Sequence, residues 1–176
     1  MACSLTTGRK VPCKSAVGGI KTVYFADYGT LGNATISAGE ITDLDGATLE
    51  FFKFDVKGNS SLETAINSSR ENGTTFYEST LNLTLTFQDK ATQEELKLIA
   101  HARPHIAVED YNGNFFLMGL EHGADVNGGT IVTGAAMGDL TGYTITAVAQ
   151  ETAPPYFVTP AAITDVASST QIDPTA

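Results

Sequence analysis

The amino-acid sequence predicts a mainly β protein with one helix, and three observations support this fold class. Threonine, serine and asparagine are plentiful, there are 17 glycines and no tryptophan, and this composition suits strands and turns better than long helices. Residues 81–87 alternate leucine or phenylalanine with polar side chains, which is the period of a strand with one buried face. Residues 91–103 have helical spacing instead. At 176 residues and 42% hydrophobic content, the chain fits one domain that can bury a core without disulfides.

The first third of the chain predicts several strands followed by a long loop. Residues 19–28 form a β-branched and aromatic run between glycines, and residues 47–57 alternate apolar with charged side chains. Residues 35–37 and 41–42 are weaker strand candidates, flanked by turn residues. Residues 58–75 are polar and have few large apolar side chains, so we expect a long loop there. Loops of this length are usually functional or disordered.

The middle of the chain predicts the clearest strand and the helix. Residues 76–88 contain the alternating leucines described above. Residues 91–103 then switch to helical spacing, and Thr92 and Glu95 have the spacing of a capping box at the helix start. Pro104 ends the helical pattern because proline cannot continue a helix.

The segment after the helix predicts a series of hairpins. Residues 105–121 read as strand, turn and strand, with Asn112 and Gly113 as the two positive-φ residues of a tight turn. Residues 127–129, Asn-Gly-Gly, predict a further turn, and residues 130–151 supply two more strands. These elements divide the chain into an N-terminal arm at 1–17, a β domain at 18–151 and an extended C-terminal arm at 152–176.

The charge distribution excludes some classes of partner. Ten basic residues stand against twenty acidic ones, and a net charge of −10 argues against a surface that grips nucleic-acid phosphates or anionic lipid. Residues 104–176 contain no lysine or arginine. This asymmetry fits a basic arm of one copy pairing with an acidic face of another, and it fits a solvated surface equally well. No segment has the roughly 18 apolar residues that cross a bilayer, so we expect no membrane anchor.

One stretch imitates a calcium-binding loop. Its oxygen-bearing side chains occupy positions one, three, five and twelve of that motif, as Asp110, Asn112, Asn114 and Glu121. The motif needs glycine at position six for its sharp turn, and Phe115 stands there. The sequence therefore favours a hairpin over a metal site.

Catalytic and zinc-binding patterns are also weak. His101 and His105 are four residues apart, but Pro104 lies between them and prevents a continuous helix. Cys3 and Cys13 both lie in the N-terminal arm, without the second pair that a zinc ribbon needs. No nucleophile motif or phosphate-binding loop is present in the sequence. We expect free thiols, no catalytic residues, no metal, no cofactor and no enzymatic activity.

Two stretches of the chain resemble the tail tube proteins of tailed bacteriophages. They are TLNLTLTFQDKATQEELKLIAHARPHIAVEDYNGNFFLMGLEHG and TGAAMGDLTGYTITAVAQETAPPY, which run as strand, helix, hairpin and then a glycine-led strand pair before a proline. The segments GRKVPCKSAVGGIKTVYFADYG and SSLETAINSSRENGTTFYE are similar to virion structural proteins of phages that infect Bacteroidetes-type bacteria. The resemblance covers about residues 8–157 and rests on the order of the elements and the general character of their sequences.

The resemblance implies an antiparallel β-sandwich or barrel of tail-tube type with one flanking helix. Six copies would close into a ring, and rings would stack into a hollow conduit for viral DNA, which passes as non-specific cargo. The implied partners are other copies of the chain and the tail terminator, baseplate and tape measure proteins. The implied location is the virion tail, after synthesis in the cytoplasm of the host bacterium. Alternatives are a tail terminator, baseplate ring or head decoration protein of the same fold, or a carbohydrate-binding β-sandwich module.

Carried onto this chain, the resemblance also implies contact residues. The loop at 58–75 would touch the next ring, and the two arms would brace neighbouring subunits. The candidates in the loop are Leu62, Ile66 and Arg70, and those in the arms are Arg9, Lys10, Lys14, Tyr156 and Phe157. A negatively charged lumen would let DNA pass because no cation holds the phosphates. The strands after Arg103, which lack lysine and arginine, are the better candidates for the lumen wall.

Overall fold

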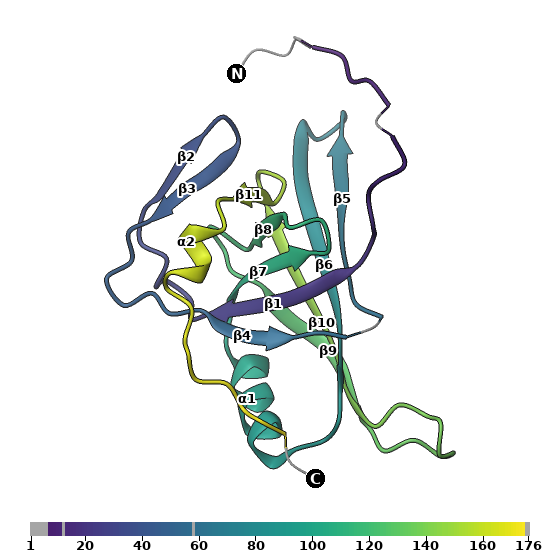
Figure 1. Cartoon of the computed structure of the whole chain (residues 1–176). Coiled ribbons are helices and arrows are strands. Elements are labelled where there is room, and N and C mark those ends of the chain that lie inside the picture. The colour runs from purple at the N-terminus through teal and green to yellow at the C-terminus, as the bar shows by residue number, and fades with distance from the viewer. Residues whose placement is uncertain (1–6, 12, 58, 175–176) are drawn as a thin grey trace.

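The computed structural model describes residues 7–11, 13–57 and 59–174, and about 45% of the chain is strand. The described residues form eleven strands and two helices (Figure 1). In chain order these are β1 Ile20–Ala26, β2 Ala34–Ser37, β3 Glu40–Leu44, β4 Phe52–Asp55, β5 Ser61–Ser69, β6 Thr74–Thr86, α1 Lys90–His101, β7 His105–Asp110, β8 Phe115–Met118, β9 Asp125–Val132, β10 Gly142–Glu151, β11 Tyr156–Val158 and α2 Ala161–Thr164. The mainly β class is confirmed.

Two sheets organise the fold. A seven-stranded sheet has the order β2-β3-β11-β8-β7-β1-β4, in which β11 runs parallel to β3 and the other pairs are antiparallel. A four-stranded antiparallel sheet has the order β5-β6-β10-β9. The strands of the two sheets cross at a steep angle, and α1 lies at one end of the molecule (Figure 1). The arrangement is sandwich-like, and neither sheet closes into a barrel within the described part of the chain.

The apolar core has two parts, one on each face of the seven-stranded sheet. Between the sheets, Leu81 and Leu83 of β6 pack with Ile106 and Val108 of β7 and with Tyr143 of β10. On the other face of the seven-stranded sheet, a second cluster gathers around Ile41, Phe51, Leu117, Val158 and Ile163. Strand β1 serves both clusters, which explains why its sequence is an apolar run and not an alternation.

The helix predicted at 91–103 is confirmed as α1, but its capping residue is not the predicted one. The Asp89 carboxylate accepts the backbone N–H groups of Ala91 at 3.0 Å and Thr92 at 3.1 Å. Asp89 is therefore the N-cap, and the expected capping box of Thr92 and Glu95 was wrong. An aspartate directly before the first turn satisfies two free N–H groups and also suits the positive end of the helix dipole.

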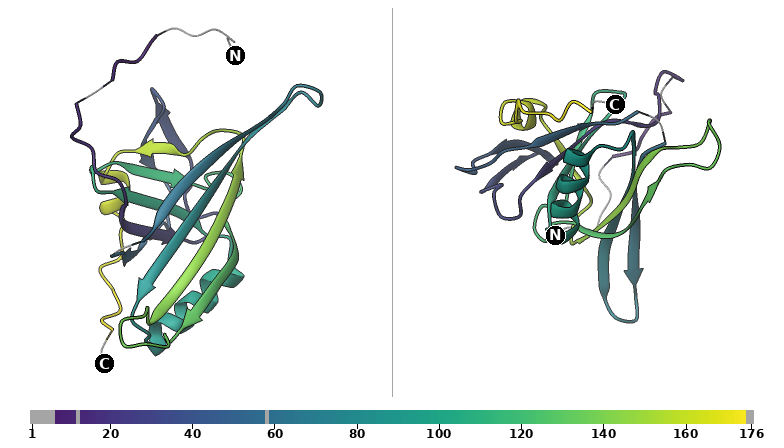
Figure 2. Two further views of the ribbon diagram at one scale, coloured as in Figure 1. Left: turned by 90° about the vertical axis from the view of Figure 1, so that its right-hand side faces the viewer. Right: turned by 90° about the horizontal axis from the view of Figure 1, so that it is seen from below.

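The long loop predicted at 58–75 was wrong. Strand β5 pairs antiparallel with β6 from Ser61 opposite Asn82 to Ser69 opposite Thr74, so most of this segment is a β-hairpin. Figure 2 shows the hairpin projecting beyond the rest of the molecule in both views. Because neither face of its outer half is covered, the sequence there lacks the apolar alternation that identifies a half-buried strand.

The turn predicted at 127–129 was also wrong, because β9 continues through these residues. A Cβ atom on Gly129 would stand 2.5 Å from the carbonyl oxygen of Thr144, so glycine allows β9 to approach β10 closely. The ladder has an irregularity between Thr146 and Ala147. The chain turns later, in the irregular segment between Val132 and Gly142.

The extended C-terminal arm predicted from residue 152 is only partly present, because part of it is strand and helix. The expectation of a single helix was also wrong, since α2 is a second one. Strand β11 lies between β8 and β3 in the seven-stranded sheet, and the following α2 buries Ile163 completely. A bridge joins Phe51 to Ala167. The longer irregular stretches of the described C-terminal segment are residues 152–155 and 168–174, and residues 7–11 and 13–18 likewise have no helix or strand.

Candidate functional site

The hairpin turn between β7 and β8 is organised by Asp110. Its carboxylate accepts the backbone N–H groups of Asn112 and Asn114, each at 2.8 Å, and also their side-chain amides. Burial alone would raise the pKa of Asp110, but these hydrogen bonds outweigh it and lower the pKa below its usual value. Gly113 has φ 81°, whereas Asn112 does not have a positive φ, so the expected pair of positive-φ residues is wrong at Asn112.

The Asn112 side chain holds the segment that leads into β1. Its Nδ2 donates to the carbonyl of Val17 at 2.8 Å, and its Oδ1 accepts the N–H of Val17 at 2.9 Å. This pair of bonds imitates one step of a strand ladder, so Asn112 does more than form the turn. It fastens the base of the N-terminal arm to the hairpin.

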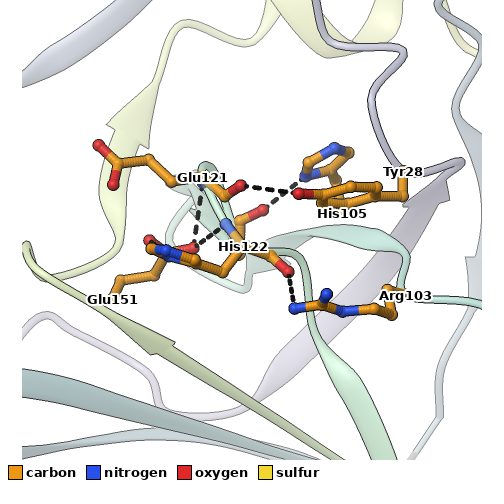
Figure 3. Close-up of polar contacts among 7 residues, drawn as sticks. Tyr28, Arg103, His105, Glu121, His122 and Glu151 are labelled. Carbon is orange, nitrogen blue, oxygen red and sulfur yellow. Dashed lines mark hydrogen bonds and ion pairs between the residues drawn. The ribbon is translucent and has the colours of Figure 1, made fainter.

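Glu121, the fourth residue of the apparent calcium loop, lies away from this turn. It belongs to the connection between β8 and β9, together with His122, and both approach Glu151 at the end of β10 (Figure 3). One oxygen of Glu151 accepts the N–H groups of Glu121 at 3.1 Å and His122 at 2.9 Å. The other oxygen lies 3.0 Å from His122 Nδ1.

Beside this carboxylate, His105 is buried and both of its ring nitrogens are engaged. The N–H of Gly29 donates to Nε2 at 3.0 Å, so Nδ1 carries the proton that binds the carbonyl of Gly119. Burial lowers the pKa of His105, against smaller opposing effects of the Gly119 carbonyl and the Glu151 charge. His101 is exposed at the end of α1. His105 therefore serves as a neutral structural brace, without a free nitrogen to join His101 at a metal.

A stack of side chains completes this polar cluster. The Tyr28 ring lies on the His105 ring with centroids 5.3 Å apart, and the Arg103 guanidinium lies 5.4 Å from the centroid of Tyr28. Arg103 Nη2 donates to the carbonyl of His122 at 2.7 Å (Figure 3). Its Nε lies 3.5 Å from Asp125. The cluster thus ties the β8–β9 connection to the chain around β1, β7 and β10.

The residues expected to contact a neighbouring ring lie on the β5–β6 hairpin, but they do not form one surface. Leu62 is half-buried and packs against its own core, near the base of the hairpin. Ile66 is 69% exposed, and Arg70 is exposed in the turn at the tip. Phe76, which sequence reasoning did not select, is 38% exposed on the partner strand. The exposed apolar residues therefore belong to the outer half of the hairpin.

The residues expected in the arms have different environments. Arg9, Lys10 and Lys14 are exposed in the irregular N-terminal segment. Tyr156 is half-buried against the second core cluster, whereas Phe157 is 51% exposed with its ring 4.8 Å from that of Phe116. Cys13 is exposed, and Cys3 lies outside the described residues, as do residues 1–6 as a whole.

The outward face of the four-stranded sheet is mostly polar, with Phe76 and Val148 among its few apolar side chains. Its residues alternate with the core-facing ones, and the strands β5, β6, β9 and β10 contain no lysine or arginine. Cross-strand hydrogen bonds join Thr146 to Asn82 at 3.1 Å and Gln150 to Glu78 at 2.6 Å. The face has three acids and otherwise small or neutral side chains. The acids are Glu63, Glu78 and Asp125.

Comparison of the chain with protein-family models, curated proteins and solved structures found no match. Within the described residues, neither helix has the length and apolar character needed to cross a membrane.

Proposed function

We propose that this chain is a virion structural protein, a tail tube subunit that assembles into stacked rings around viral DNA. The observation that carries the proposal is the outward face of the β5-β6-β10-β9 sheet. This face is broad and mostly polar, its four strands contain no lysine or arginine, and the charged strand residues on it are the three acids named above. It is suited to line a passage for DNA, in the virion tail.

A passage for DNA must not bind the DNA phosphates tightly. Each lysine or arginine that meets a phosphate releases counterions and adds a favourable term to binding, which would hold the DNA in place. Glu63 and Glu78 instead repel phosphates, whereas Asp125 is paired with Arg103 at 3.5 Å. Cross-strand hydrogen bonds engage Thr130 with Thr144, Thr146 with Asn82 and Gln150 with Glu78. DNA would therefore find no site at which to stop.

The edges of the same sheet support self-assembly. Within the described residues, β5 pairs only with β6 and β9 pairs only with β10, so each presents an unpaired edge. Exposed edges invite pairing with another chain. Pairing β5 of one copy with β9 of the next would close a ring and leave no edge free. Six copies per ring is the number that the resemblance to tail tube proteins implies.

The hairpin tip is the proposed contact between successive rings. The β5–β6 ribbon projects from the rest of the molecule (Figure 2). Ile66, opposite Tyr77, exposes apolar surface on one face of the ribbon, and Phe76, opposite Asn67, exposes it on the other face. Arg70 is exposed in the turn at the tip. A neighbouring copy that covers this surface would remove it from water, at about 25 cal/mol per Å² of apolar area buried. The hairpin takes the place of the loop that the sequence suggested for this role.

Electron microscopy of the purified full chain tests the proposal, alongside sedimentation analysis. We expect hollow filaments with a regular axial repeat. The Ile66→Asp variant should stop stacking while leaving the sheet intact, whereas Ile36→Asp, at an isoleucine 44% exposed on the other sheet, is the matched control. Circular dichroism checks that both variants fold.

The outcomes separate the alternatives. Rings that never stack would favour a tail terminator, baseplate ring or head decoration protein over the tube. A chain that stays monomeric at every concentration and salt condition would contradict the proposal altogether. Filaments that form equally well with Ile66→Asp would refute the role of the hairpin.

A further inference from the structure

We propose that Glu121, His122 and Glu151 form a binding site for one divalent transition-metal ion, with Zn²⁺ as the ion that best suits the donor set. This inference goes beyond the proposed function and stands whether or not the chain forms tubes. Sequence reasoning missed the site because Glu151 lies 29 residues from His122 along the chain.

The spacing of the donor atoms carries the proposal. One ligand atom from each of the three residues lies within 4.8 Å of the other two. His122 Nδ1 and Glu151 Oε2 are already 3.0 Å apart. Donors on a tetrahedral zinc, with bonds of about 2.0–2.1 Å, are roughly 3.3 Å from one another. The histidine and Glu151 therefore need little movement, and Glu121 needs a change of side-chain torsion. The ion would replace the proton that Nδ1 donates to Glu151 Oε2, and the neutral imidazole would carry its proton on Nε2.

Glu121 is free to make that change. Its side chain is exposed, and among the described residues its carboxylate is in no hydrogen bond or ion pair, since the polar contacts of Glu121 involve its backbone. A carboxylate without a partner loses nothing within the protein when it turns towards an ion. It would supply the third ligand.

The rest of the site is held in place by groups that need not move. Glu151 Oε1 accepts the two backbone N–H groups of Glu121 and His122, which leaves Oε2 facing the imidazole. Arg103 fixes the carbonyl of His122, and His105 fixes that of Gly119 at the start of the same connection. Such outer hydrogen bonds orient metal ligands and are needed for affinity.

The donor set selects the class of ion. Two carboxylates and one neutral imidazole place two negative charges around the site, while the nearby Arg103 is already paired with Asp125. An imidazole nitrogen favours zinc and similar ions over calcium or magnesium, which prefer oxygen ligands alone. Glu121 and His122 are exposed, so water can complete the coordination.

An ion at this place would fasten the two sheets together. Glu151 ends β10 of the four-stranded sheet, and the Glu121–His122 pair follows β8 of the seven-stranded sheet. An ion that binds the folded chain and not the unfolded one raises stability in proportion to the logarithm of its concentration above Kd. Zinc should therefore raise the melting temperature.

Isothermal titration calorimetry with ZnCl₂ tests the site, on untagged full chain stripped with a chelator. Cys3→Ser and Cys13→Ser are introduced first, because thiols also bind zinc. We expect one saturable site, a melting temperature that rises with zinc, and weaker binding of CaCl₂ and MgCl₂. Glu121→Gln should weaken zinc binding at least about tenfold, since it removes a ligand without disturbing the hydrogen bonds of Glu151.

The matched controls are His101→Gln and Glu94→Gln, which change an exposed histidine and an exposed glutamate on α1. Both should bind zinc as the parent does. Absence of saturable binding in the parent would overturn the proposal. So would binding that Glu121→Gln and His122→Gln leave unchanged, or binding that His101→Gln weakens as much as they do. Calcium binding tighter than zinc binding would refute the assigned ion.

Discussion

Ile163 offers the sharpest test of how the C-terminal segment is built into the fold. Its side chain is fully buried, with 0% exposed surface, against the second core cluster. Replacing a buried isoleucine by alanine costs about 2–5 kcal/mol, from the lost transfer energy and the cavity. Because α2 is a single short turn that can settle into part of the space, we expect Ile163→Ala to cost about 2–3 kcal/mol.

Thermal and urea unfolding measure this cost. For a chain of this size, about 2–3 kcal/mol corresponds to a melting temperature lower by roughly 4–12 °C. Ile172→Ala is the matched control, since Ile172 lies in the irregular segment beyond α2 and is 37% exposed. It should cost less than about 1 kcal/mol. Equal, small effects of the two changes would mean that the whole segment is the extended arm that the sequence suggested, and would refute the structural reasoning.

An arm deletion must spare β11 and α2, because both are packed into the fold. Removing residues 152–176 would take β11 out of the middle of a sheet and leave β8 and β3 without the strand that lies between them. Loss of assembly in that deletion would report misfolding. Removing residues 170–176 keeps the Ser168 N–H bond to Phe51 and tests the arm alone.

Three further predictions concern the polar contacts. Burial lowers the pKa of His105 below 6.5, so as the pH falls His105 is protonated in the unfolded chain before it is protonated in the folded one. The free energy of unfolding should therefore decrease as the pH drops below 6.5. In urea unfolding, His105→Gln should flatten this pH dependence, and His101→Gln should leave it unchanged. The lowered pKa of Asp110 contributes stability above about pH 3.8 that is lost on further acidification, so Asp110→Ala should remove that acid-dependent step from the unfolding curve. Asn112→Ala should release the N-terminal arm and speed trypsin cleavage after Lys14, and unchanged cleavage would contradict the clamp on Val17.

The sequence predicts those elements whose own residues carry the decisive signal. The leucines of β6 alternate because one face is buried, α1 has helical spacing, and Gly113 marks the turn between β7 and β8. It fails where the signal comes from elsewhere in the fold. Strand β9 contains Gly129 because the backbone of β10 comes close, whereas a Cβ atom on Gly128 would meet no neighbour. Without that knowledge of β10, the glycine pair predicts a turn.

The candidate site was even less accessible to sequence reasoning. Asp110, Asn112 and Asn114 do act together, but through hydrogen bonds within one turn. Glu121 belongs with these three residues only in the spacing of the sequence motif. In the structure it lies beside His122 and Glu151. That meeting depends on where β10 ends relative to the β8–β9 connection, which is a property of the packed sheets and not of any local pattern.

The outer half of the β5–β6 hairpin has a weak strand signal and is also the proposed contact between copies of the chain. Strand β6 has 13 residues, but its core-facing leucines begin only at Leu81, so its first half and the facing part of β5 form a ribbon without a core. A two-stranded ribbon alone is marginally stable in water. No other part of the described chain covers the faces of this ribbon, so its sequence does not need the alternating apolar residues that predict a strand. If neighbouring copies cover Ile66 on one face of the ribbon and Phe76 on the other, they supply the missing core. The weakest sequence signal in the sheet would then mark the segment through which we propose that copies assemble.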